Sequence, residues 1–124
     1  MSAGGNLQAA IAGALSGLEI TGVYDGPPAR APFPYAVIDA GMETDWSHKS
    51  GEGREVLVAV TVWDDQPARL HELADAVEAS VAVVRDAQEW ELASLRLLRR
   101  RTVRDVAGPW ATAIDFRARL LAKN

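Results

Sequence analysis

The stretch EVLVAVTVW, residues 55–63, is apolar on both of the faces that a β-strand would present. Successive side chains of a strand point to opposite sides of its sheet. One side would therefore carry Val56, Val58, Val60 and Val62, and the other Leu57, Ala59, Thr61 and Trp63. A strand with two apolar faces favours cover on both of them. We therefore predict a central strand here, with a second protein layer against it.

Other segments of the chain carry their own periodic patterns. The clearest two-residue alternation spans residues 110–120, and strands are also expected at 35–42 and 92–103, with a short β-prone piece at 19–24. The apolar LASLRLL, residues 92–98, is equally compatible with a helical turn. Apolar residues at helical spacing predict a helix over 6–17, with Asn6 as its N-cap. A second helix is expected to begin at the acidic, proline-bearing stretch 64–67 and to extend to about Arg85.

This order of elements predicts the α+β class. We expect a largely antiparallel sheet of four to five strands with two helices packed on one face. The length of 124 residues indicates a single domain over 1–124. We expect a soluble, unprocessed chain, since no basic leader and no apolar run of membrane-spanning length is present.

Two segments stand out between the predicted elements. Four of the six prolines lie within GPPARAPFPY, residues 26–35. Since proline fixes φ and lacks an N–H donor, residues 26–34 are predicted to form a rigid extended arm that leads into the strand at Tyr35. Residues 41–54, GMETDWSHKSGEGR, are predicted to form a long hairpin or a mobile loop. Trp46 is the only large apolar side chain of that loop besides Met42, and could make an interface contact.

Charge is distributed unevenly along the chain. Residues 1–91 hold 15 of the 17 acids, whereas residues 92–124 hold 8 of the 13 bases. If the last two strands pair, Arg99, Arg101, Arg117 and Arg119 could share one surface. Three roles are open for that surface: nucleic-acid binding, a solvated face, or an interface with an acidic surface of another subunit. The interface is favoured over nucleic acid, because the net charge is −4 and no aromatic side chains interleave with the arginines.

Catalytic and ligand-binding patterns are weak in this sequence. Asp64 and Asp65 are adjacent and are explained as a helix start, and His48 and His71 have no partner at ligand or triad spacing. The chain contains no cysteine, and the glycines of SGEGRE are not followed by a helix start. We therefore expect no catalytic, cofactor-binding or metal-binding residues.

The order of parts resembles the tail-completion or tail-terminator family of long-tailed phages and gene transfer agents. The features that carry the resemblance are an N-terminal amphipathic helix, GVYDGPP at 22–28, FPYAVI at 33–38, the long polar hairpin, the valine strand ending in Trp63, a second helix, and IDFRARL at 114–120.

The resemblance implies a structural virion protein and not an enzyme. Members of that family form a ring, expected here to be a hexamer, which ends growth of the tail tube and joins the tail to the head connector. Expected partners are copies of the same chain, the tail tube protein and the connector or stopper protein, with assembly in the host cytoplasm and a final place at the head-tail junction. No membrane partner is expected.

Interface residues follow as hypotheses from this comparison. The proline arm, with Pro32 and Phe33, would contact an adjacent subunit, and the hairpin, with Asp45, Trp46 and Lys49, would meet the tail tube or the connector. The alternatives are another head-tail connector, such as the stopper, and a small nucleic-acid-binding domain.

Overall fold

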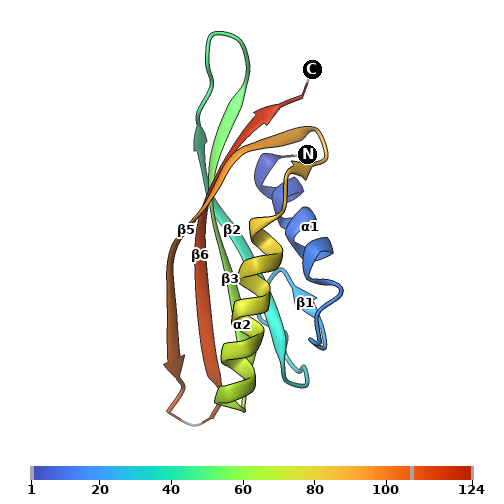
Figure 1. Ribbon diagram of the computed structural model, residues 1–124, viewed down its shortest axis with the longest axis vertical. Coiled ribbons are helices and arrows are strands. Elements are labelled where there is room, and N and C mark those ends of the chain that lie inside the picture. Colours follow the sequence, from blue (N-terminus) through green and yellow to red (C-terminus); the bar gives the residue numbers. More distant parts are fainter. Residues whose placement is uncertain (1, 107, 124) are drawn as a thin grey trace.

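The computed structural model describes residues 2–106 and 108–123. Two helices and six strands form one layer of helices and one curled sheet (Figure 1). The elements in chain order are α1 (Ala3–Leu15), β1 (Val23–Tyr24), β2 (Tyr35–Asp45), β3 (Gly53–Asp64), α2 (Pro67–Ala82), β4 (Asp86–Ala87), β5 (Trp90–Arg104) and β6 (Trp110–Ala122). The predicted α+β class is confirmed.

The sheet has the strand order β1-β2-β3-β6-β5-β4. Every neighbouring pair is antiparallel except β1 and β2, which run parallel. The sheet is therefore largely antiparallel, as expected from the sequence, but it is mixed and has six strands where four to five were expected. The difference lies in β1 and β4, which have two residues each and are too short to produce a periodic pattern.

Strand β3 lies inside the sheet, between β2 and β6, as its apolar pattern predicted. Its four alternate valines at 56, 58, 60 and 62 are buried against the helix layer, where Leu7 and Ile11 of α1 and Leu70 and Val77 of α2 complete the core. The helices cover this face only (Figure 1). The second protein layer expected over the other face is not supplied by the described residues of this chain.

Helix α1 begins earlier than predicted, because Ser2 and not Asn6 is its N-cap. The Ser2 Oγ accepts a hydrogen bond of 3.0 Å from the backbone N–H of Gly5. A second free N–H, that of Gly4, donates to Oε1 of Glu43 at 2.8 Å, which ties the helix start to β2. Asn6 lies one turn inside the helix and is buried.

The predicted 41–54 segment is an extended hairpin with shorter loop bounds than expected. Strand β2 continues to Asp45 and β3 starts at Gly53, so the loop itself spans 46–52. Arg54 lies among acids of the hairpin, 3.6 Å from carboxylate oxygens of Glu43 and of Glu52. Strand pairing and these contacts order most of a stretch whose composition is typical of a loop.

Asp64 connects the end of β3 to the start of α2. Its carboxylate is fully buried and accepts two hydrogen bonds from Arg69, at 2.7 and 2.6 Å, and one of 3.2 Å from the N–H of Gln66. Burial alone would raise the pKa of Asp64, but these hydrogen bonds and the Arg69 charge outweigh it and hold the pKa below its usual value. The carboxylate therefore fixes the N-cap residue Gln66 and the first-turn residue Arg69 against the end of β3.

We expect Asp64→Asn to lower the free energy of unfolding by about 2 kcal/mol at pH 7, because it removes charge-assisted hydrogen bonds from a buried site. Asp65→Asn, a change at an exposed neighbour with only a 3.7 Å contact to Arg69, should cost less than about 0.5 kcal/mol. Urea unfolding monitored by circular dichroism measures both.

The same pair of proteins also tests the pKa of Asp64. A depressed folded-state pKa gives stability that is fully present above the unfolded value of about 3.9 and is lost as the pH falls through the folded value. The difference between wild type and Asp64→Asn should therefore shrink below about pH 4. A difference that stays constant down to pH 2 would contradict the assignment.

Candidate functional site

The sheet face that the helices leave uncovered is the candidate surface, and we call it the open face. Strand register fixes which side chains lie on it, because residues paired across strands share a face. The open face carries Tyr35, Val37, Asp39 and Met42 of β2, Glu55, Leu57, Ala59, Thr61 and Trp63 of β3, Asp115, Arg117 and Arg119 of β6, and Arg96, Leu98, Arg99 and Arg101 of β5.

The register brings together four arginines singled out in the sequence. Arg99 pairs with Asp115 and Arg101 with Ala113, while Arg117 and Arg119 occupy the same face of β6. Arg100 lies on the opposite face, where its guanidinium donates a hydrogen bond of 2.7 Å to Asp75 of α2. The arginines of β5 and β6 therefore have two roles. Arg100 binds α2, and Arg99, Arg101, Arg117 and Arg119 line the open face.

Only some of the open-face arginines are neutralised within the chain. Arg99 donates to Asp115 at 2.8 Å, and Arg119 donates to Glu55 at 2.9 Å. Arg117 and Arg96 pair directly across the strands, and the buried Nε of Arg117 has no hydrogen-bond partner in the structure.

Like charges directly opposite one another are unfavourable in a sheet. Within residues 2–106 and 108–123, no acid forms an ion pair with Arg96, Arg101 or Arg117. This part of the open face therefore retains positive charge that an acidic partner could neutralise.

Apolar side chains lie beside these charges. Met42, Leu57 and Leu98 are 58%, 37% and 50% exposed, and together with Asp39 and Arg99 they line a shallow hollow on the open face. Exposed apolar area next to unneutralised charge is typical of a protein contact surface.

Sequence alternation did not reveal the place of Leu98, because the register shifts between Leu97 and Arg99. Such an irregularity moves the following side chains to the other face. The register shift between Asp39 and Met42 likewise brings Met42 onto the open face, opposite Leu57.

The proline arm ends at one end of the open face. Residues 26–34 form neither helix nor strand, and Thr21 holds their last part by donating from Oγ1 to the carbonyl of Pro32 at 2.6 Å. Phe33 stacks on Tyr35 at 5.7 Å between ring centroids, and Tyr35 stacks on Trp63 at 6.4 Å. The arm is therefore fixed within the chain, and Phe33 extends an aromatic row of the open face, while Pro32 is exposed.

The hairpin loop lies at the other end of the open face. The guanidinium of Arg119 stands 5.4 Å from the centre of the Trp46 ring, and His48 packs edge-on against that ring at 4.5 Å. Asp45 accepts a hydrogen bond of 2.7 Å from Ser47, and both Asp45 and Lys49 are exposed. The structure thus joins Trp46 to Arg119, two residues that the sequence had suggested for separate contacts.

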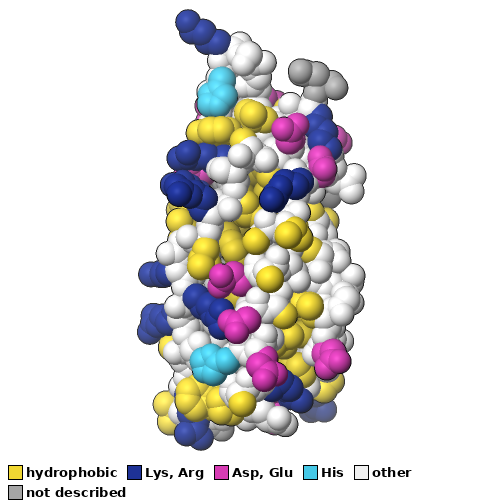
Figure 2. Space-filling model, viewed as in Figure 1, with side chains coloured by type: hydrophobic (Ala, Val, Ile, Leu, Met, Phe, Trp, Pro, Cys, Tyr) yellow, Lys and Arg dark blue, Asp and Glu magenta, His cyan; other side chains and the backbone are white. Residues whose placement is uncertain are grey.

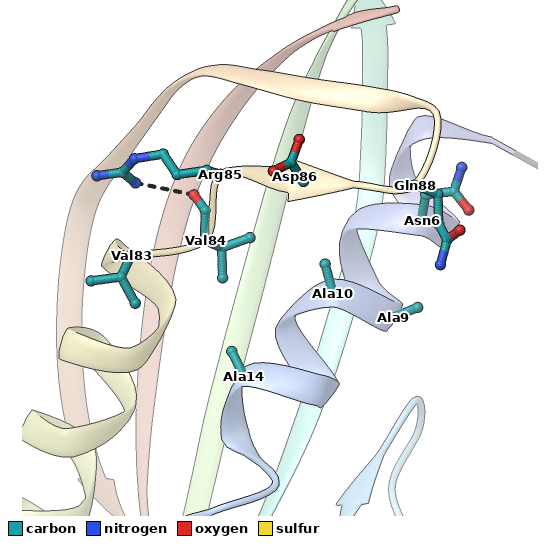
Figure 3. A pocket seen from close by; sticks show the side chains of 9 residues that line it. All are labelled: Asn6, Ala9, Ala10, Ala14, Val83, Val84, Arg85, Asp86 and Gln88. Atoms are coloured by element: carbon teal, nitrogen blue, oxygen red, sulfur yellow. Dashed lines mark hydrogen bonds between the residues drawn. The ribbon is translucent and has the colours of Figure 1, made fainter. Parts of the chain in front are cut away.

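Other regions offer less for ligand chemistry. A pocket between α1 and the connection from α2 to β4 is lined mainly by alanine and valine (Figure 3), and Arg85 there donates to the carbonyl of Val84 at 3.1 Å. Within the described residues, no three His, Asp or Glu side chains are grouped as metal ligands, and no helix is long and apolar enough to cross a membrane.

A small α+β domain with one covered and one exposed sheet face is typical of a subunit that functions through its surfaces. Comparison with known proteins gives the particular family. The family model for tail completion protein gp17 matches residues 5–121, so the chain belongs to that family. The resemblance inferred from the sequence is confirmed, and the family is one of structural tail proteins, not of enzymes.

A solved structure gives a second comparison. A chain of the "Virion of native gene transfer agent (GTA) particle" is 25% identical, with a TM-score of 0.69, and the match covers 95% of this chain and 96% of that chain. No curated protein sequence matches the chain.

The division of the arginines between the two sheet faces predicts unequal effects of their substitution on the stability of the isolated subunit. Arg100→Met should lower the free energy of unfolding by about 1 kcal/mol, because it breaks the contacts to Asp75 and Glu78 of α2. Arg101→Met should change it by less than about 0.5 kcal/mol. Urea unfolding of the dissociated protein measures both, and an equal loss for Arg101→Met would show that this arginine also supports the fold.

Proposed function

We propose that this protein forms a ring at the end of a phage-type tail tube, stops tail growth there and joins the tail to the head connector. Membership of the tail completion family and the similarity to a chain of a gene transfer agent virion support a structural role in a tail. The observation that carries the finer proposal is the open face, where exposed apolar side chains adjoin unneutralised arginines.

Ring formation requires two different, complementary surfaces on each subunit, because a head-to-tail contact joins unlike patches. On the open face, Arg101 and Arg117 have no acid partner among the described residues and supply a positive patch, with the ion-paired Arg99 and Arg119 beside them. Acidic side chains lie over α2, whereas basic ones gather along the β5 side of the molecule (Figure 2). This separation supports association between copies, with a hexamer as the proposed closed form.

The two ends of the open face have proposed contacts of their own. Pro32 and Phe33 would meet an adjacent subunit, and a segment already held by Thr21 loses little conformational entropy on docking. Asp45, Trp46 and Lys49 would meet the tail tube or the connector from the hairpin. The proposed location is the head-tail junction of the virion, after assembly in the host cytoplasm.

Deletion of the coding sequence in a producing strain tests the function. We expect overlong or unattached tails beside filled heads in electron micrographs, and restoration by the wild-type gene. Tails of normal length that fail only to attach would favour a connector role, and normal particles would refute the proposal.

Trp46→Ala is expected to weaken attachment of the tail without unfolding the domain, because Trp46 lies in the hairpin loop at the end of the open face and outside the buried core. Trp46→Phe, which keeps an aromatic ring, is the matched control. The fraction of joined particles in micrographs and the melting temperature of the purified protein give the two readouts. Unchanged joining with Trp46→Ala would remove Trp46 from the proposed contact.

A further inference from the structure

Both edges of the sheet are left partly open by their short outer strands. Strand β1 covers only Ala36 and Val37 of β2, and β4 covers only Trp90 and Glu91 of β5. In the described part of the chain, residues 38–45 of β2 and 93–104 of β5 have no strand on their outer side. Such edges present backbone N–H and C=O groups that can pair with another strand.

The two free edges carry opposite charge. Residues 38–45, IDAGMETD, contain three acids and no base, whereas residues 93–104, ASLRLLRRRTVR, contain five arginines and no acid. Pairing of β5 with β5 would oppose arginines, and pairing of β2 with β2 would oppose acids. Charge therefore disfavours both symmetric contacts and favours the unlike one.

The register places the unlike edges at the same level of the sheet. One row of paired residues leads from Asp39 through Ala59 and Asp115 to Arg99, so Asp39 and Arg99 lie on the open face at its two edges. The next row leads from Met42 through Leu57 and Arg117 to Arg96. A neighbouring copy in the same orientation would thus bring its Asp39 beside Arg99 and Arg96.

Strand direction is compatible with this contact. Because β2, β3, β6 and β5 are each antiparallel to the next, β5 runs opposite to β2. A copy added in the same orientation would therefore pair its β2 with β5 in the antiparallel sense. Strand β1 pairs only with residues 36–37 of β2, and β4 pairs only with residues 90–91 of β5. Neither short strand therefore covers the free stretches 38–45 and 93–104.

We infer that neighbouring copies of this chain join edge to edge, with the free edge of β5 pairing antiparallel with the free edge of β2 of the next copy. This inference rests on the proposed ring and names its contact. Asp39 of one copy neutralises Arg96 and Arg99 of the next, and Met42 of that copy lies against the aliphatic part of Arg96. After each contact, the joined copies still have one free β2 edge and one free β5 edge. Further copies can therefore be added until the ring closes.

Disulfide trapping tests the inference directly, since the natural chain contains no cysteine. In Asp39→Cys with Arg99→Cys, the two positions of one chain are three strand spacings apart, about 14 Å, too far for an internal disulfide. Mild oxidation of the assembled protein should give a ladder of covalent oligomers on a non-reducing gel. Arg96→Cys or Arg101→Cys in place of Arg99→Cys allows for a stagger of the strands.

Two controls accompany the trapping. Each single-cysteine variant can form dimers at most. Asp39→Cys with Glu72→Cys places the second cysteine on the exposed side of α2 that faces the end of α1, away from the β5 edge, so it should give no ladder. A protein that forms rings by native mass spectrometry but gives no ladder with any of the three β5 positions would overturn edge pairing and leave the proposed function intact. Failure of the function would instead appear as normal particles after gene deletion.

Charge exchange gives a second, independent test. Asp39→Arg should weaken assembly at least about tenfold, measured as the protein concentration at half assembly, because it places like charges together. Adding Arg96→Asp should restore most of that loss, since Arg96 has no ion pair within the described residues of its own chain. Wild-type assembly of Asp39→Arg, or no recovery in the double variant, would contradict the Asp39 contact.

Discussion

The structure depends on one imbalance: the central strand β3 is apolar on both faces, but α1 and α2 cover only one of them. The alternate valines of β3 are buried beneath α1 and α2, where they pack with the apolar side chains of both helices and of β6 in the core. The other side of the same strand, from Leu57 to Trp63, is left to the surface, where Tyr35 stacks on Trp63. The open face and its exposed apolar side chains follow from that arrangement.

The arginines of β5 and β6 are distributed between the covered face and the open face of the sheet. Arg100 lies on the helix side and holds α2 through Asp75, whereas Arg99 and Arg101 lie on the open face. Arg99 is balanced by Asp115, but Arg96 and Arg117 oppose each other without an acid of their own. A subunit with this pattern carries unneutralised charge when alone, which agrees with its similarity to a chain of a virion particle.

The short strands β1 and β4 determine which parts of the sheet edges are left free for the edge contact inferred above. A pair of two-residue strands adds little to the core, yet they limit which parts of β2 and β5 are available to another chain. Proteins commonly protect their sheet edges with charges, register irregularities and short outer strands. Here the charges on the two edges have opposite sign, so the same features that prevent symmetric pairing allow the head-to-tail contact that a ring requires.

The sequence alone determined the α+β class, the two helices, the interior position of β3 and the strand at 110–120, because these depend on local apolar periodicity. Only the tertiary structure placed β6 between β3 and β5 and chose Ser2 over Asn6 as the cap of α1. Pairing partners lie far apart in sequence, two-residue strands have no period, and register shifts near Leu98 move side chains between faces. The sequence predicted that four arginines share one face only if the last two strands pair, and the pairing of β5 with β6 established that condition.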